Sequence, residues 1–296
     1  MAYQCVVLVK QVPDTANITG KAMREDGTVN RAALPAIFNP EDLNALEMAL
    51  QVKEQHGGSV TVLTMGPPRA AELLREALYR GADSVILLTD REFAGSDTLA
   101  TSYALKCAVE RIGEYDLVFC GRQAIDGDTA QVGPQVAEKL GLPQITYAES
   151  ILSFQGDEIV VQRAFPLGKE MVRCTLPCLL TVVGSANRPR PPLAHRLLTY
   201  KLAATPLEYA ALLERWPEFE TEEALDVYLA QRGLKIPLWT AADLCAEEGN
   251  LGMSGSPTKV LQIDYVVLET STSRWVPASR EGVGELMEEL LEDHIL

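Results

Sequence analysis

The chain has 296 residues, of which 47% are apolar and 23% charged, and its formal net charge is −15. These proportions are typical of a folded protein with a sizeable core and exclude a chain dominated by disorder. The acidic balance and the lack of a Lys/Arg block disfavour nucleic-acid binding, because a phosphodiester backbone would be repelled. Small molecules and other proteins remain as ligands.

The sequence shows no pattern typical of a signal peptide, a transmembrane helix or a metal centre. The apolar run near the amino terminus is too short for a secretory signal, and no run approaches about 18 apolar residues, so we expect a cytoplasmic protein without a transmembrane segment. The six cysteines lack the spacing of a metal or iron–sulfur centre, and only three histidines occur. We therefore expect no metal site and no catalytic protein residue. Cys174 and Cys178 are predicted to lie on one strand bent at Pro177.

Buried β-strands and amphipathic helices alternate in the first half of the chain. Helices are expected from Asn39-Pro40 to Gly57, over Pro68–Arg80, from Ser96 onwards and over Thr129–Leu140. This alternation predicts a doubly wound parallel α/β sheet. The predicted strands are Tyr3–Val9, Ser59–Met65, Ser84–Thr89, Asp116–Cys120 and a weaker Gln144–Tyr147.

Two parts of the chain depart from this alternation. Residues 10–37, with a turn signal at Asp26-Gly27, are expected to form a hairpin or a long loop, and Ile151–Phe165 is expected to form a hairpin. We predict a first domain over residues 1–186 and a second region over 187–296. The second region should contain a proline-broken loop, helices at Pro206–Arg215 and Thr221–Gln231, a strand at Ile263–Thr270 and an acidic helix at Arg280–Leu291.

The segment GRQAIDGDTAQVGP, residues 121–134, follows a predicted strand and precedes a helix, the place where open α/β sheets bind ligands. Asp128 and Gln131 have the spacing of a capping box for that helix. The segment lacks both common nucleotide-binding glycine motifs, so an ordinary strand-to-helix turn remains an alternative. Asn39–Asp42 and Met65–Pro68 should reach the same sheet edge, which is compatible with a nucleotide cleft built from backbone amides; three helix starts without a ligand remain the alternative.

Five segments occur in order along the chain: VLVKQVPDT, FNPEDLNALEMAL, TMGPP, LYRGAD and GRQAIDGDTAQVGPQVAEKLGLPQ. Together they resemble the beta subunit of electron-transfer flavoproteins from about Val6 to Val183, with weaker similarity at AADL and SGSPTKV. The resemblance implies a sheet of the adenine-nucleotide alpha-hydrolase-like type with an added hairpin or antiparallel part and an extended C-terminal arm. It also implies a heterodimer with an alpha subunit.

The same resemblance implies one adenine-nucleotide site. In simple carriers of this family that site holds AMP, whereas in electron-bifurcating members it holds a second FAD that takes hydride from NADH. Gly127 favours FAD, because a glycine permits the close backbone approach that a pyrophosphate needs. The implied site residues are Leu8, Asn39, Pro40, Glu41, Asp42, Met65, Gly121, Arg122, Gln123, Ala124, Ile125, Asp126, Gly127, Asp128, Thr129, Ala130, Gln131 and Val132.

Three functions remain open at this point. In a bifurcating protein, electrons would pass from NADH through the beta-site FAD to the alpha-bound FAD and to ferredoxin or flavodoxin, with Arg122 favouring an anionic flavin or the nicotinamide phosphate. A simple carrier would hold structural AMP and link a flavin-dependent dehydrogenase to a membrane oxidoreductase. A universal-stress-type nucleotide sensor is the third alternative.

The sequence also departs from the family pattern. Arg163 is followed by Ala-Phe-Pro-Leu-Gly instead of an acidic cluster, and the lysine-rich partner-recognition loop is replaced by PRPPLAHRLLTYK. Its leucine anchor would fall near Leu193 or Ala194. Residues Thr205–Gly233 resemble an insertion, so we expect a redox partner different from that of the simple carriers.

Overall fold

The computed structural model describes residues 2–14, 34–166, 168–258 and 275–292. The chain divides into two compact units, Met1–Lys259 and Val260–Leu296, and each is considered by itself.

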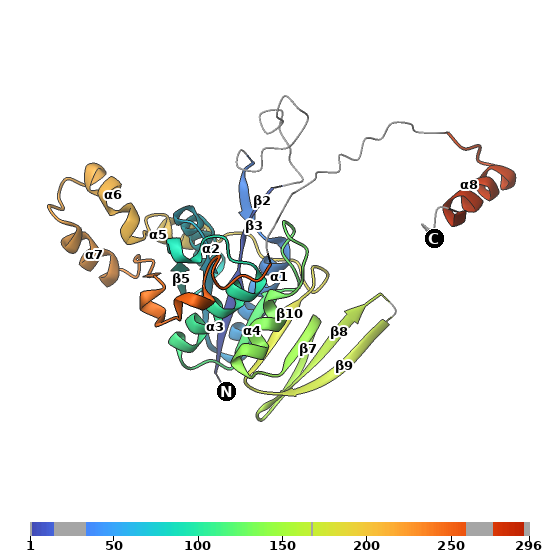
Figure 1. Cartoon of the computed structure of the whole chain (residues 1–296), viewed down its shortest axis with the longest axis horizontal. Helices are drawn as coiled ribbons and strands as arrows, with labels where there is room; N and C mark the ends of the chain where they lie inside the picture. The colour runs from blue at the N-terminus through green and yellow to red at the C-terminus, as the bar shows by residue number, and fades with distance from the viewer. Residues whose placement is uncertain (1, 15–33, 167, 259–274, 293–296) are drawn as a thin grey trace. The chain divides into compact units, whose positions relative to one another are not determined.

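The described part of the first unit is built on a nine-stranded sheet in the order β11-β5-β4-β1-β6-β10-β7-β8-β9. Figure 1 shows the end of this sheet formed by β7, β8 and β9. Neighbouring strands from β11 to β7 are parallel, whereas β8 and β9 continue the sheet as an antiparallel extension. The strands are β1 (Tyr3–Val9), β4 (Gly58–Met65), β5 (Ser84–Leu88), β6 (Leu117–Gly121), β7 (Gln144–Gln155), β8 (Glu158–Phe165), β9 (Gly168–Thr175), β10 (Cys178–Val182) and β11 (Leu238–Trp239).

Two pairs of helices cover the two faces of the parallel part. Helices α1 (Pro40–His56) and α2 (Ala71–Arg80) pack on one face, together with Cys5 and Val7 of β1. Helices α3 (Thr98–Ile112) and α4 (Val132–Leu140) pack on the other, with Val6 and Leu8. The predicted doubly wound α/β sheet is confirmed, and the near-continuous apolar strands follow from burial on both faces.

The strand order places a switch point beside β1. After β1 the chain moves outward through β4 and β5, then returns through α3 to β6 on the other side of β1. The carboxyl ends of β1 and β6 therefore border the crevice where such sheets bind ligands. Short strands β2 (Gln11–Pro13) and β3 (Ala36–Phe38) pair antiparallel just beyond β1, and the predicted Asp26-Gly27 turn lies outside the described residues.

Several local predictions need correction. Helix α4 begins at Val132 and not at Thr129, and the segment containing Cys174 and Cys178 forms two separate strands, β9 and β10, instead of one bent strand. Strand β9 pairs antiparallel with β8 at the edge of the sheet, whereas β10 lies between β6 and β7. The hairpin predicted at Ile151–Phe165 is confirmed by the pairing of β7 with β8.

The region after residue 186 contributes to the same core. Leu225, Leu229 and Ile236 are fully buried in the cluster that also contains α1 and α2 side chains.

In the second unit the predicted acidic helix is present as α8, and the strand predicted at Ile263–Thr270 lies outside the described residues. The helices after residue 186 are α5 (Ala194–Tyr200), α6 (Tyr209–Arg215), α7 (Glu222–Gln231) and α8 (Arg280–Glu292), with short 3-10 turns at Pro206–Glu208, Ala242–Leu244 and Glu248–Asn250.

Gly133 in α4 lets this helix approach the sheet closely. A Cβ atom there would lie 2.6 Å from Cys120 Sγ and 2.9 Å from Thr181 Cγ2. We expect Gly133→Ala to lower the free energy of unfolding by about 1–3 kcal/mol through overpacking. This loss should occur even though alanine has a higher helix propensity than glycine, by up to about 1 kcal/mol. Urea denaturation measures the change, with Gly249→Ala as control because a Cβ there meets no atom within 4 Å. Equal stability of the two variants would contradict this packing role.

Candidate functional site

The Asp42 carboxylate occupies the switch point between β1 and β6. Its Oδ2 accepts a hydrogen bond of 2.8 Å from the Lys10 N–H, and its Oδ1 accepts one of 2.9 Å from the Gly121 N–H. Asp42 is 5% exposed, and burial raises the pKa of its carboxyl to about 7, although the two backbone hydrogen bonds act in the opposite direction. A Cβ at Gly121 would lie 2.5 Å from Asp42 Oδ1, so only glycine fits at this strand end.

Asn39 fixes the beginning of the loop that follows β6. Its Nδ2 donates to the Gln123 carbonyl at 2.9 Å, and its Oδ1 accepts from the Ile125 N–H at 3.1 Å. The predicted start of α1 at Asn39-Pro40 is confirmed, but the Asn39 side chain makes no capping bond to α1. It is fully buried and serves the loop instead.

The two aspartates of the loop have partners within the protein. Asp126 forms an ion pair with Lys10, whose Nζ lies 2.7 and 2.8 Å from its two carboxylate oxygens. Asp128 accepts a hydrogen bond of 2.9 Å from Gln123 Nε2. The predicted capping box of Asp128 with Gln131 is therefore wrong: α4 has no side-chain cap, and Asp128 is turned away by a left-handed backbone with φ of 49°.

Backbone amides remain available in the next turn. Among the described residues, no group accepts a hydrogen bond from the N–H of Thr129, Ala130 or Gln131. Ala130 has a φ of 52° and Gln131 is right-handed, an alternation that turns successive N–H groups toward one concave side, at the start of α4. Such a turn at a helix N-terminus is an anion-binding arrangement. By contrast, Asp97 caps α3 by accepting hydrogen bonds from Leu99 and Ala100.

Arg122 is held by protein groups on the other side of Gly121. Its guanidinium pairs with Glu41 at 3.1 Å and lies 5.6 Å from the ring centroid of Tyr147. Glu41 also accepts a hydrogen bond of 3.0 Å from the Gln123 N–H. A pocket of about 450 Å³ opens here, and it is lined by Glu41, Arg122, Tyr147, Ala164, Phe165, Pro166, Val183, Gly184 and Ser185.

The structure brings most of the predicted site residues to one sheet edge, because Asn39–Asp42 at the start of α1 bond directly to the loop after β6. Leu8 of β1 instead packs in the core against side chains of α3 and α4. Met65 lies partly buried at the end of β4. The prediction missed the roles of Lys10 and Tyr147 and the contacts of Asp97 with Ser256 and Thr258. Lys10 and Ser256-Pro257-Thr258 do belong to the motifs VLVKQVPDT and SGSPTKV, which was the available signal.

Comparison with known proteins identifies the class. Residues 26–205 match the model of the electron transfer flavoprotein domain, which covers more than half of the chain. The electron transfer flavoprotein subunit beta of Thermoanaerobacterium thermosaccharolyticum is 40% identical over 291 residues, covering 98% of this chain and 99% of the relative. The chain belongs to the beta subunits of the electron transfer flavoprotein family.

Two further relatives belong to named reductase systems. The acryloyl-CoA reductase electron transfer subunit gamma of Anaerotignum propionicum is 39% identical, covering 98% of both chains. Subunit CarD of the caffeyl-CoA reductase-Etf complex of Acetobacterium woodii is 48% identical over 186 residues, covering 62% of this chain and 70% of the relative. Within the described residues, no helix is long and apolar enough to span a membrane, and no group of three His, Cys, Asp or Glu side chains is placed to hold a metal ion.

The raised pKa of Asp42 predicts a pH-dependent stability. Because the folded-state pKa of about 7 exceeds the ordinary value of 3.8, the folded chain binds the extra proton, and this stabilising contribution is lost as pH rises through 7. We expect the free energy of unfolding to fall by about 1.4 kcal/mol per pH unit between about pH 5 and pH 6 from this group, by about half as much per unit at pH 7, and to level off above it. Urea titrations from about pH 5 to about pH 8 measure the slope. Asp42→Asn should lack this component, and an identical slope in both proteins would contradict the assignment.

Proposed function

We propose that this beta subunit binds one adenine nucleotide, with its phosphates on the amides of Thr129, Ala130 and Gln131. The observation that carries the proposal is the left-handed turn before α4, which leaves those three N–H groups without a protein acceptor among the described residues. Of the two neighbouring acids, Asp126 is paired with Lys10, and Asp128 is held by Gln123. Asn39 and Glu41 support this placement, because their side chains bond to the loop that leads to the turn.

We propose FAD as that nucleotide and NADH as the electron donor. Two features favour FAD over AMP. A Cβ at Gly127 would meet no protein atom within 4 Å, so the space before the loop is open to a pyrophosphate. The pocket of about 450 Å³ beside Arg122 and Tyr147 offers room for a ring system. The reductase systems named for two relatives fit electron bifurcation, with ferredoxin or flavodoxin as an acceptor.

The flavin, when bound, supplies the hydride and one-electron chemistry, and the protein supplies position and electrostatics. Arg122 is already paired with Glu41, so it contributes little net charge to a phosphate and instead presents its guanidinium beside Tyr147 to the pocket. An aromatic ring stacked there would contact a cation and an aromatic face together. No side chain of the chain is needed as a proton donor in this scheme.

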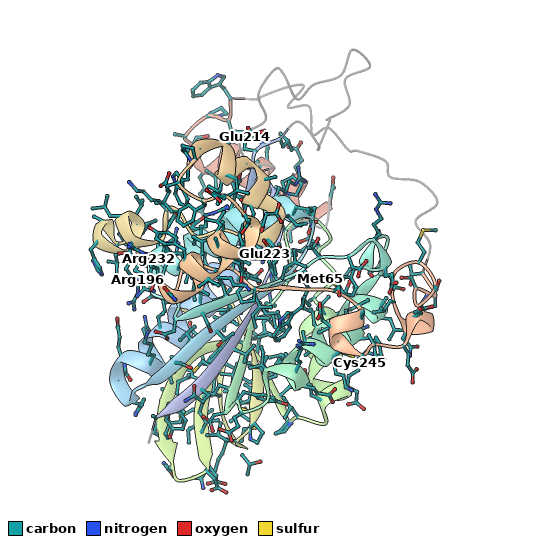
Figure 2. All side chains as sticks on the ribbon, turned by 90° about the vertical axis from the view of Figure 1, so that its left-hand side faces the viewer. Met65, Arg196, Glu214, Glu223, Arg232 and Cys245 are labelled. Carbon is teal, nitrogen blue, oxygen red and sulfur yellow. The ribbon has the colours of Figure 1, made fainter. Side chains whose placement is uncertain are left out.

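We also propose that the region 187–296 serves partner binding, in a cytoplasmic heterodimer with an alpha subunit. Helix α8 carries exposed Val283, Leu286, Met287 and Leu291 at helical spacing, the pattern of a helix that lies in a partner's groove. Helices α6 and α7 expose several carboxylates, including Glu214 and Glu223 (Figure 2), and among the described residues neither of these two forms an ion pair. This acidic surface favours a redox partner with a basic face.

One experiment separates the two nucleotides. We expect the heterodimer, purified without air, to release two FAD and no AMP on denaturation, and NADH to bleach its flavin absorbance. One FAD and one AMP, with flavin that NADH does not reduce, would replace this function by the simple carrier between a flavin-dependent dehydrogenase and a membrane oxidoreductase. A stable flavin-free homodimer of this chain would favour a nucleotide sensor.

Gly127 offers a finer test of FAD against AMP. We expect Gly127→Ala to raise the Kd of FAD about tenfold, a change of about 1.4 kcal/mol, because the methyl group occupies the path of the pyrophosphate. The Kd of AMP, which has one phosphate, should rise by less than about twofold. Gly249→Ala is the matched control, since a Cβ there also meets no atom within 4 Å. Equal losses for FAD and AMP would place the pyrophosphate elsewhere.

A further inference from the structure

The start of α3 is bonded to two parts of the chain that are remote in sequence. Asp97 Oδ2 accepts a hydrogen bond of 3.0 Å from the Thr258 N–H, and the Asp97 N–H donates to Ser256 Oγ at 2.8 Å. The next residue, Thr98, donates from Oγ1 to Gln131 Oε1 at 2.9 Å. Asp97 thus holds the segment around residues 256–258, and the adjacent Thr98 holds Gln131, one of the residues whose amides we propose to bind phosphate.

Both ends of this connection are anchored. Ser256 is 7% exposed, and its Oγ donates to the Gly252 carbonyl at 2.5 Å. Leu251 is 2% exposed in the same apolar cluster as α3 and α4 side chains. On the other side, Gln135 of α4 donates from Nε2 to Thr98 Oγ1 at 3.5 Å. The start of α3 therefore cannot move without disturbing either the loop before α4 or the segment 252–258.

We propose that Thr98 and Asp97 couple the nucleotide site to the attachment of the C-terminal segment. A nucleotide on the amides of residues 129–131 fixes Gln131, Gln131 fixes Thr98, and Asp97 then holds the Thr258 N–H more firmly. Because coupling between two sites is reciprocal, the attached segment in turn favours the nucleotide. The inference rests on the proposed nucleotide site. It adds that a bound nucleotide controls how firmly Asp97 holds Thr258, after which the chain continues to α8. Thr98 is a positioning residue in this scheme.

The chain contains a matched control for this arrangement. Asp90 also accepts from a nearby N–H, that of Glu92 at 3.2 Å, and holds a later segment through the Ala241 N–H at 3.1 Å. No hydrogen bond between described residues joins Asp90 or Arg91 to the loop of residues 121–131. Asp90→Ala should therefore loosen the later segment without altering nucleotide binding.

Hydrogen–deuterium exchange on the full-length chain, with and without saturating AMP or FAD, tests the coupling. In the unaltered chain we expect either nucleotide to slow exchange in the peptide covering residues 252–258 several-fold. Thr98→Val should abolish that slowing and raise the nucleotide Kd about 2- to 10-fold, the effect of one hydrogen bond. Thr98→Ser, which keeps the hydroxyl, should restore both, and Asp90→Ala should change neither.

The outcomes separate the two proposals. Nucleotide binding with unchanged exchange at residues 252–258, or slowing that persists in Thr98→Val, would overturn the coupling and leave the nucleotide site standing. Failure of both AMP and FAD to bind would overturn the nucleotide site and the coupling together.

Discussion

One buried carboxylate joins the two strands between which the site lies. Where β1 and β6 end, their pairing stops and the N–H groups of Lys10 and Gly121 have no strand partner, a situation that costs about 1–3 kcal/mol for each buried group left unsatisfied. Asp42 accepts from both. Since Asp42 lies in the first turn of α1, this pair of bonds fixes where that helix begins. Asn39 and Glu41, and through them the loop after β6, take their positions from it.

The acidity of the loop is thereby compatible with a bound phosphate. Asp126 is neutralised by Lys10 and Glu41 by Arg122, while the raised pKa of Asp42 leaves it partly protonated near pH 7. The Lys10 side chain is 49% exposed, so its ion pair contributes less than about 1 kcal/mol to stability. Its effect is local: it removes a negative charge from the neighbourhood of the free amides, where an anion is attracted by N–H dipoles and not by a cationic side chain.

The sheet and its helices were predictable because burial on two faces leaves a strong sequence pattern, as in Tyr3–Val9. The interior of the loop was not, because its backbone is set by long-range contacts. Local spacing favoured a capping role for Asp128, but Gln123 and Asn39 hold the loop in a conformation that turns Asp128 away from α4. Asp97 was recognisable as the start of α3, whereas its bond to Thr258, 161 residues away, leaves no local pattern.

The four helix starts at this edge of the sheet differ in the backbone donors that they offer to a phosphate group. Helix α1 begins with Pro40, which has no N–H, and continues with two acids. The turn before α2 begins with Pro67 and Pro68 and so lacks two donors. Helix α3 is capped by its own Asp97. Among these four starts, α4 combines uncapped amides with a left-handed turn, which is the reason for proposing residues 129–131 as the position of an anion.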